Sequence, residues 1–379
     1  MSLTTSRRAL IAAASTAAVV LTSLAATAGA AQAQPASAAH GIGGILAGRS
    51  CAPSALAVDF SDALDKLTYH GIEVGGLSSL AYDPRSLAWA STVDNHASDP
   101  ARIWFFRNPA NPVVVRDPLV LKRPDGTPYD GTNSDNEGLA VLPNGDYVVS
   151  SETEPSIRIF GRDGVQKSSL PVPARFAVTG TTPAGQATSN ATLEGLTITP
   201  SGTEIIASME GALSGDVAAN GDATLHRFLV YDADRHGNWT LTKQVAYRAQ
   251  PGNRIAEATA YGRDSLLVEE ASFNAPVGND VQLYAVTGLS RAKNVSAVTD
   301  LATAPAADVV RKSLVADLVK CPTLGAPSRQ TQANPLLDNY EGMAVTADVA
   351  GFAGVSLISD DNFGATQYTR VLNLVARLP

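Results

Sequence analysis

The feature that most constrains this fold is a β-hairpin signal that recurs along the chain, clearest between Glu137 and Glu152. Residues 139–142 form a short apolar run, 143–146 (Pro-Asn-Gly-Asp) have strong turn chemistry, and 147–151 form a second β-prone run. Because a hairpin brings its two ends together, Glu137 and Glu152 should lie at the same edge of the sheet. Neighbouring carboxylates repel each other unless a cation lies between them. The hairpin therefore predicts a site for positive charge at this edge.

The same unit recurs five times, at a spacing of roughly 60 residues that widens before the last copy. The first strands of the five units begin at Gly75, Glu137, Glu194, Glu257 and Glu341. Repeats of about 40–60 residues that each contain four short strands are typical of a β-propeller. We therefore predict an all-β propeller with five four-stranded blades, and the wide gap before the last unit leaves room for a sixth.

The two ends of the chain are expected to meet in the last blade. This unit has only three strands before the C-terminus, and a closed ring leaves no exposed sheet edge, so the segment 57–60 should supply the fourth. The predicted domain spans 56–379, after a loose Ala/Gly/Ser-rich leader at 34–55. The segment 302–319 is the one place where a short helix is expected.

The N-terminal residues 1–33 have the pattern of an export signal and are not expected to belong to the fold. Arg7-Arg8 precedes an Ala/Val/Leu-rich segment, and small residues end in an Ala-x-Ala site, which predicts cleavage after Ala33. The residues around Arg7 resemble a twin-arginine signal, with a Sec signal or an uncleaved anchor as alternatives. No later stretch reaches the 18 or more apolar residues of a membrane span. We therefore expect a secreted protein, extracellular or periplasmic, without membrane attachment after cleavage.

The charge balance disfavours polyanionic partners. The whole chain carries a formal net charge of −8, and cleavage would remove Arg7 and Arg8 but no acid, leaving −10. Such a protein is not suited to nucleic acid or anionic membranes, but it is suited to binding cations. We expect a monomer that acts on a small-molecule substrate, possibly a phosphorylated one.

The chain has two cysteines, Cys51 and Cys321. In an exported protein a disulfide is the expected state, and two free buried thiols are the alternative. The bond would close a very long loop, for which the chain-entropy model gives an upper limit of about 5 kcal/mol. It would reinforce the closure of the ring.

Acidic residues stand at equivalent positions of nearly every unit. Four of the five first strands are preceded by Glu, three of these in a Glu-Gly pair, and all five second strands end in an acid. Because first strands line the channel of a propeller, these acids should crowd one of its mouths. The predicted metal ligands are Asp94, Glu137, Glu152, Glu194, Glu210, Glu257, Glu270 (or its neighbour Glu269), Glu341, Asp360 and Asp361. The alternative is that they cap strand ends and hold loops in place.

Carboxylates in such a ring need a compensating cation, and Ca²⁺ accepts six to eight oxygen ligands in flexible geometry. Zinc is disfavoured because no histidines have ligand spacing. The segment 130–135 has some calcium-loop character without the EF-hand spacing, and we interpret it as a solvated turn.

No Gly-x-Ser-x-Gly elbow is present, so a hydrolase of this kind would be metal-assisted. Its catalytic candidates are Glu137, Glu194 and Glu341, and its candidates for binding an anionic substrate are Arg158, Arg175 and Arg254.

These motifs resemble those of a known family, the secreted bacterial phytase-like propellers named for an "esterase-like activity of phytase". The resemblance covers about residues 70–378. It rests on the segments 135–139, 151–152, 157–160, 339–343, 358–363 and 367–369. It implies a calcium-dependent phosphoester or ester hydrolase. The chain departs from the pattern at Gly75-Gly76, Glu257-Ala258 and Asp94-Asn95-His96.

Two other functions remain open at the level of sequence. One is a non-catalytic propeller that is stabilised by calcium and binds a partner or ligand. The other is a sugar-lactonase or quinoprotein-like propeller, which would also carry carboxylates at its channel.

Overall fold

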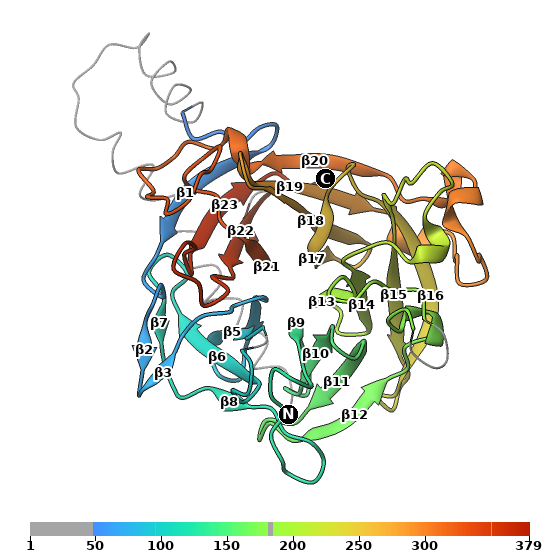
Figure 1. The fold of residues 1–379 in the computed structure, drawn as a ribbon, viewed down its shortest axis with the longest axis horizontal. Helices are drawn as coiled ribbons and strands as arrows, with labels where there is room; N and C mark the ends of the chain where they lie inside the picture. The colour runs from blue at the N-terminus through green and yellow to red at the C-terminus, as the bar shows by residue number, and fades with distance from the viewer. Residues whose placement is uncertain (1–47, 95, 181–184, 350) are drawn as a thin grey trace.

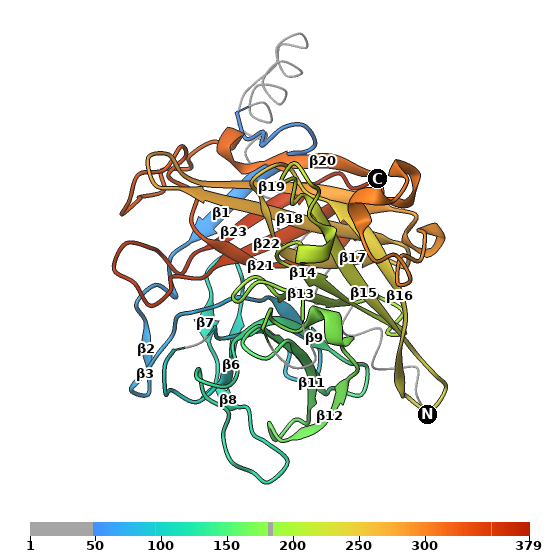
Figure 2. The same cartoon turned by 45° about the vertical axis from the view of Figure 1, so that its right-hand side comes forward.

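A computed structural model describes residues 48–94, 96–180, 185–349 and 351–379, so the predicted signal peptide lies outside the described residues. Five sheets follow one another around a central axis, and β9, β13, β17 and β21 lie nearest that axis (Figure 1). The predicted five-bladed propeller is confirmed, and the described residues form no sixth blade. Figure 2 shows the same arrangement of sheets turned by 45° about the vertical axis.

The blades are built in chain order, each from its innermost strand outward. Blade 1 contains β4 (Ala81–Asp83), β5 (Ala88–Thr92), β6 (Arg102–Arg107) and β7 (Val113–Val114), with β8 (Leu119–Val120) also pairing with β6. Blade 2 contains β9 (Asn136–Val141), β10 (Tyr147–Ser151), β11 (Ser156–Phe160) and β12 (Gln166–Leu170). Blade 3 contains β13 (Leu193–Ile198), β14 (Glu204–Met209), β15 (Leu225–Ala233) and β16 (Trp239–Arg248).

Blade 4 contains β17 (Arg254–Gly262), β18 (Ser265–Asn274), β19 (Gly278–Thr287) and β20 (Lys312–Asp317). Blade 5 contains β21 (Tyr340–Val349), β22 (Phe352–Ser359) and β23 (Val371–Ala376), with β1 (Ala55–Ser61) as its outermost strand. A small hairpin, β2 (Thr68–Tyr69) and β3 (Ile72–Glu73), precedes blade 1.

Turn chemistry fixes the hairpin of blade 2 as predicted. Gly145 has a φ of +90°, which a residue without Cβ adopts readily, and its N–H donates to the Leu142 carbonyl at 2.8 Å. The Leu142 N–H in turn donates to the Asp146 carbonyl at 2.9 Å. The pairing of Val141 with Tyr147 follows from this turn, and it brings Asn136 opposite Ser151 at the other end of the hairpin.

The expected helix at 302–319 is wrong. This segment forms the one-turn 3₁₀ helices η4 (Leu301–Thr303) and η5 (Ala306–Asp308), then strand β20, then the start of η6 (Leu318–Lys320). The outer edge of blade 4 needs a strand, and pairing of β20 with β19 outweighs the weak local helical pattern. Within the part of the chain that the structure describes, no helix has the length and apolar character to cross a membrane.

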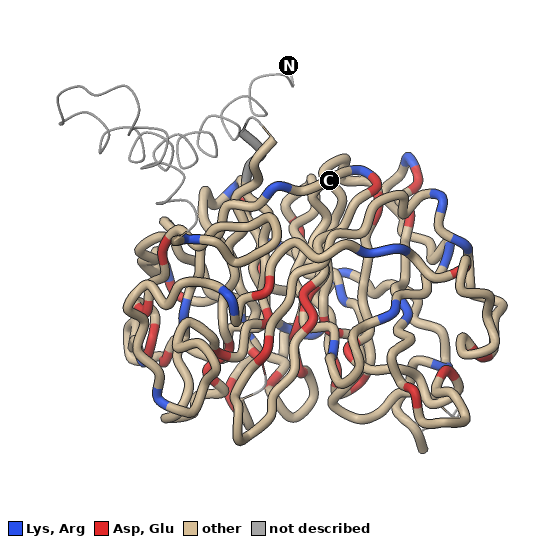
Figure 3. Tube along the Cα trace, turned by 90° about the horizontal axis from the view of Figure 1, so that it is seen from above, with Lys and Arg blue, Asp and Glu red and all other residues tan. Residues whose placement is uncertain are grey.

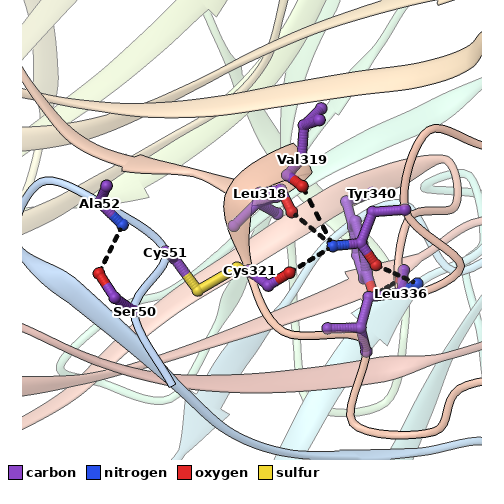
Figure 4. The surroundings of a disulfide bond; sticks show 9 residues. Ser50, Cys51, Ala52, Leu318, Val319, Cys321, Leu336 and Tyr340 are labelled. Carbon is purple, nitrogen blue, oxygen red and sulfur yellow. Dashed lines mark hydrogen bonds between the residues drawn. A yellow bond between two sulfur atoms is a disulfide. The ribbon is translucent and has the colours of Figure 1, made fainter. Parts of the chain in front are cut away.

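The ring closes through its two chain ends, as predicted. Strand β1 pairs antiparallel with β23, from Ala55 opposite Ala376 to Ser61 opposite Val371. The Cys51–Cys321 disulfide is also confirmed, and it joins residues 270 positions apart (Figure 4). Cys51 lies just before β1, the outermost strand of blade 5. Cys321 directly follows η6, which comes after β20, the last strand of blade 4. The disulfide therefore links blade 5 to blade 4.

The core consists of apolar layers between neighbouring blades. Phe105 of blade 1 packs with Tyr147 and Phe160 of blade 2, and Phe228 of blade 3 packs with Val268 of blade 4. Along the described part of the chain, basic and acidic residues are distributed over the molecule (Figure 3). These apolar layers join each blade to the next around the ring.

Candidate metal centre

Acidic residues from all five blades gather where the inner strands begin and the second strands end. Hydroxyl groups there tie the second strand of one blade to the inner strand of the next: Thr92 of β5 donates to the Glu137 carbonyl at 2.7 Å, and Ser150 of β10 donates to the Glu194 carbonyl at 2.8 Å. Ser150 also accepts the Gly138 N–H at 2.7 Å. These bonds hold the backbone of each acid-bearing residue against its neighbour.

The glycine of the Glu-Gly pair has a packing role. A Cβ on Gly138 would lie 2.4 Å from Leu196 Cβ and 2.6 Å from the Glu194 carbonyl oxygen. A Cβ on Gly342 would lie 2.5 Å from the Ser79 carbonyl carbon. Inner strands of neighbouring blades therefore approach so closely that only glycine fits, and the Glu before it is carried to the axis.

We call the resulting group the axial cluster. It comprises Asp94, Asp135, Glu137, Glu152, Glu194, Glu210, Arg254, Glu269, Glu341 and Asp360, which influence one another electrostatically. Most of these side chains are buried, Glu137 with 6% and Glu194 with 4% exposure. The cluster carries nine acids and one arginine, so it has a large excess of potential negative charge.

Arg254 neutralises one side of the axial cluster. Its guanidinium lies 3.0 Å from Glu194, 3.2 Å from Glu210 and 2.8 Å from Glu341, and it also donates to Asn339 at 3.0 Å. Burial alone would lower the pKa of Arg254. The charges of the three carboxylates outweigh this effect, so the pKa of Arg254 lies above its ordinary value. This residue at the start of β17 therefore joins blades 3, 4 and 5 through a permanent positive charge.

The other side of the axial cluster has the geometry of a cation site. One carboxylate oxygen from each of Asp94, Asp135 and Glu137 lies within 4.8 Å of the others. Glu137, Glu152 and Glu194 form a second such group, so Glu137 is shared by both. The salt bridges of Arg254 reach Glu194 in this second group but not Glu137 or Glu152.

Crowding and burial raise the pKa values of these acids. Burial, a hydrogen bond to Asp135 and the charge of Asp360 raise the pKa of Asp94 to about 10. Burial and the neighbouring Asp94 raise the pKa of Glu137 well above its usual range. Burial and Glu210 raise the pKa of Glu152 to about 8, against the hydrogen bond from the Thr192 N–H. Without a cation, the raised pKa values of Asp94, Glu137 and Glu152 favour protonation of these three acids at neutral pH.

Glu269 is the acid of blade 4 that faces the cluster. It is fully buried, and neither of its carboxylate oxygens has a hydrogen-bond partner among the described residues. Burial raises its pKa to about 8, although the charge of Arg254 opposes this shift. The sequence pattern indicated Glu269 only as the alternative to its neighbour Glu270.

Three predicted ligands lie in other surroundings, where each accepts hydrogen bonds from backbone, tyrosine or lysine donors. Glu257 accepts the N–H groups of Leu196 at 3.1 Å and Ala258 at 2.7 Å, so it ties blade 4 to blade 3. Asp361 accepts the Gly76 N–H at 3.0 Å and forms a salt bridge with Lys66. Both carboxylates therefore have structural partners of their own.

Glu270, the third, points away from the axial cluster. It forms a salt bridge with Lys312, accepts a hydrogen bond from the Tyr247 hydroxyl and accepts the Gln250 N–H at 2.8 Å. Because successive side chains of a strand point to opposite faces, Glu269 and Glu270 cannot both face the axis.

Only one of the three predicted substrate-binding arginines lies at the cluster, namely Arg254. Arg158 is buried in blade 2, where it donates to Ser134 at 3.0 Å and lies 4.7 Å from the Tyr129 ring. Arg175 donates to the Val298 and Thr299 carbonyls and holds a connecting segment in place.

Asp135 is a candidate ligand that the sequence pattern did not indicate. The interpretation of 130–135 as a solvated turn holds for Asp130, which accepts the Thr132 N–H, but Asp135 is only 5% exposed and belongs to the Asp94 group. Its place directly before the Asn136-Glu137 strand start was the available signal.

The family follows from a comparison over most of the propeller. The family model described as "Phytase-like: Esterase-like activity of phytase" matches residues 72–363. The chain belongs to this phytase-like family. The family resemblance seen in the Glu-Gly and Ser-Asp-Asp-Asn-Phe motifs is thereby confirmed. A comparison with curated proteins found no match to the chain.

Solved structures give weaker similarities. A protein of unknown function from Dyadobacter fermentans has 10% identity and a TM-score of 0.44, covering 86% of this chain and 100% of that chain. A putative oxidoreductase (glucose dehydrogenase) from Thermus thermophilus has 15% identity and a TM-score of 0.36, covering 79% and 83%. A putative gluconolactonase has 10% identity and a TM-score of 0.35, covering 85% and 94%. At these TM-scores the alignments carry no argument about function.

The donor set of this phytase-like propeller fits a hard divalent cation. All the candidate ligands of the two groups are carboxylate oxygens, which suit Ca²⁺, and no histidine belongs to either described group. The raised pKa values of Asp94 and Glu152 also fit, because a cation would replace the protons that these acids hold. The axial cluster can therefore hold a metal on the side that Arg254 does not reach.

Proposed function

We propose that the axial cluster binds Ca²⁺ and that the protein is an exported, calcium-dependent hydrolase of phosphate esters or other small esters. The observation that carries the proposal is the pair of three-carboxylate groups that share Glu137. Membership of the family described by esterase-like activity of phytase supports the reaction class. Ca²⁺ prefers this kind of oxygen-rich, flexible site.

The two sides of the cluster would have different roles. Asp94, Asp135, Glu137 and Glu152 would hold the cation, and Glu194 would complete the second group. When bound, the cation would polarise a phosphoryl or acyl oxygen and lower the pKa of a water molecule. Arg254 would orient Glu194 and Glu341 through its salt bridges, so that the cation site is formed before it is filled.

The test is an activity assay with metal control. Mature protein would be assayed on p-nitrophenyl phosphate, a phosphodiester, p-nitrophenyl acetate and phytate, each with calcium and with a chelator. We expect turnover of at least one substrate with calcium and its loss with the chelator. Absence of calcium-dependent turnover on all four would refute the hydrolase.

A matched pair of variants tests the position of the site. Glu137→Gln keeps the shape of a shared ligand but removes its charge, and we expect at least about a tenfold loss of calcium affinity. Asp163→Asn is the control, because Asp163 is exposed in an outer turn and accepts the Val165 N–H. Equal effects of the two substitutions would place the cation elsewhere.

A non-catalytic, calcium-stabilised propeller is the second candidate. It is favoured by the acids that already serve as ties between blades, such as Glu257 on Leu196 and Asp361 on Gly76. If the chelator lowered the melting temperature while no substrate was turned over, this function would replace the first.

Export and partner class belong to the same proposal. The Cys51–Cys321 disulfide suits an oxidising compartment outside the cytoplasm. We propose that the mature protein acts there as a monomer on a small, possibly phosphorylated molecule, without nucleic-acid or membrane partners. Identification of the mature N-terminus by mass spectrometry would test cleavage after Ala33.

A further inference from the structure

A second site candidate lies outside the axial cluster, in a groove of about 740 Å³ between blades 3 and 4. Its walls are the end of β16 with the connection to β17, the loop at 220–224 and the segment that leads into β20. A volume of this order accommodates a small organic molecule. Nothing in the proposed hydrolase function uses it.

The groove is positively charged although the chain has a net charge of −8. Three basic side chains line it, Arg248, Arg311 and Lys312, against one acid, Asp222. A local excess of positive charge on an acidic protein attracts anions of small size.

Two of these basic groups remain available for a ligand. Arg311 is exposed and forms no salt bridge within the part of the chain that the structure describes. Arg248 contacts Asp222 at 3.2 Å, but both side chains are well exposed, at 49% and 37%. Exposed pairs of this kind contribute little, so an anion can compete for the guanidinium.

The third basic group is held by a buried acid beneath the groove. Glu270 is fully buried and binds Lys312, the Tyr247 hydroxyl and the Gln250 N–H. The Lys312 ammonium also lies 4.0 Å from the centre of the Tyr284 ring. Glu270, which the sequence pattern indicated as a metal ligand, thus holds Lys312 and the Gln250 backbone in place at the border of this groove.

The remaining wall is apolar. Pro251, Val309 and Val310 line the groove beside the basic side chains. A ligand that carries both an anionic group and a carbon skeleton would therefore find a partner for each part.

We propose that this groove binds a small organic oxyanion, a phosphate or carboxylate compound, with Arg248 and Arg311 as its principal contacts. Guanidinium groups bind both kinds of oxyanion through paired hydrogen bonds. Lys312 is neutralised by Glu270, so it would border the ligand without adding net positive charge. The site is independent of the metal centre, because none of the axial acids lines it.

Calorimetric titration of the mature protein with pyrophosphate and with citrate tests the site. A chelator in the buffer prevents either probe from binding through calcium at the axis. We expect binding of at least one probe with a dissociation constant in the millimolar range or tighter, weakened by raised ionic strength. Comparison of the two probes distinguishes phosphate from carboxylate recognition. Absence of heat and of any melting-temperature shift with both probes at about 10 mM, well above that range, would overturn the proposal.

The variants assign the contacts. The double substitution Arg248→Ala/Arg311→Ala should weaken binding at least about tenfold, which corresponds to about 1.4 kcal/mol. Arg291→Ala is the matched control, since Arg291 is 81% exposed and lies outside the groove lining. Unchanged binding in the double variant, or an equal loss in the control, would contradict the assignment. Both altered arginines are exposed, so the melting temperature should confirm that the variants fold.

Discussion

Arg254 connects three blades through one guanidinium group. It starts the inner strand of blade 4, and its partners Glu194 and Glu210 belong to blade 3 and Glu341 to blade 5. Three acids next to one another would otherwise have to hold protons or bind a metal. The arginine therefore leaves Asp94, Asp135, Glu137 and Glu152 among the carboxylates of the cluster without a salt bridge to it, which is the side where we propose the cation.

Replacement of Arg254 should destabilise the metal-free protein most strongly at neutral pH. Arg254→Met keeps the volume but leaves buried carboxylates unpaired, so the free energy of unfolding at pH 7 should fall by about 3 kcal/mol. The loss should be smaller at pH 5, because the raised pKa values of Glu194 and Glu210 favour protonation of both carboxyl groups as the pH falls. Denaturant unfolding in a chelator measures both values. Arg291→Met, at an 81% exposed position, should change them by less than about 0.5 kcal/mol.

Glu152 predicts the sign of a pH effect. Its pKa is about 8 in the folded chain against an ordinary 4.5, so the unfolded state releases the proton first. Ionisation of Glu152 therefore lowers stability progressively between about pH 4.5 and 8. In a chelator, Glu152→Gln should gain stability relative to the wild type from pH 5 to pH 9, by at least about 1.4 kcal/mol.

The same substitution should act in the opposite direction with calcium. Gln can still accept the Thr192 N–H that the Glu152 carboxylate accepts, so the comparison isolates the charge. With saturating calcium the wild type should be the more stable protein at pH 7, because its ionised carboxylate binds the metal. The free energy of unfolding of both proteins would be measured in the chelator at several pH values. If the difference between them did not change with pH, the raised pKa of Glu152 would be contradicted.

Sequence spacing placed most acids correctly at one end of the ring, but it did not decide their partners. Glu137, Glu194 and Glu341 stand at the same repeat position, yet Arg254 contacts only the last two. The reach of an arginine across the axis depends on the angle between blades, which no local pattern contains. The contact of Asp135 with Asp94 has the same origin, since Asp94 comes from another blade and only the arrangement of the blades brings the two together.

At the scale of the strand, the Glu-Gly pair combines two functions. The Glu reaches the axis, while the glycine allows the next inner strand to approach. Gly195 has the Ala258 N atom 2.6 Å from the position of a Cβ, and Gly138 has the Leu196 N atom at the same distance. The repeat of the glycine therefore has a packing reason that is independent of any metal.

Gly138→Ala should test this packing reason. The added methyl group would force β9 away from β13, and we expect a loss of about 3 kcal/mol in the free energy of unfolding. Gly262→Ala is the control within an inner strand, because its Cβ would meet only Ser265, at 3.5 Å. Denaturant unfolding measures the free energy of unfolding of both variants. If the Gly138 variant were as stable as the Gly262 variant, the close approach of β9 to β13 would be refuted.

The elements themselves were largely predictable, because turn residues and alternating strands are local signals. The hairpin of 137–152 and the outer strand at 57–60 were both found where the sequence predicted them. Glu270 shows the limit of this reasoning. It follows Glu269 on β18, so one of the two must face away from the axis, and the bulge in the pairing of β17 with β18 decides which.

At the scale of the whole molecule, stability depends on how the ring is closed. The N-terminal strand β1 completes blade 5 by pairing with β23, and the disulfide then fastens the preceding segment to blade 4. The Asp317 N–H, at the end of β20, also donates to the Cys51 carbonyl at 2.9 Å. Closure therefore has a hydrogen-bonded part and a covalent part, and these can be separated by mutation.

Removal of the disulfide should lower stability without opening the ring. The bond joins residues 270 positions apart, and the chain-entropy model gives about 5 kcal/mol as an upper limit for so long a loop. We expect the Cys51→Ala/Cys321→Ala variant to lose about 2–5 kcal/mol in the free energy of unfolding. Wild-type protein unfolded in the presence of a reductant should lose a similar amount. Calcium binding should persist in the variant, because the pairing of β1 with β23 does not involve either cysteine. Loss of calcium binding together with stability would instead mean that the covalent link, and not strand pairing, holds the five blades in register around the axis.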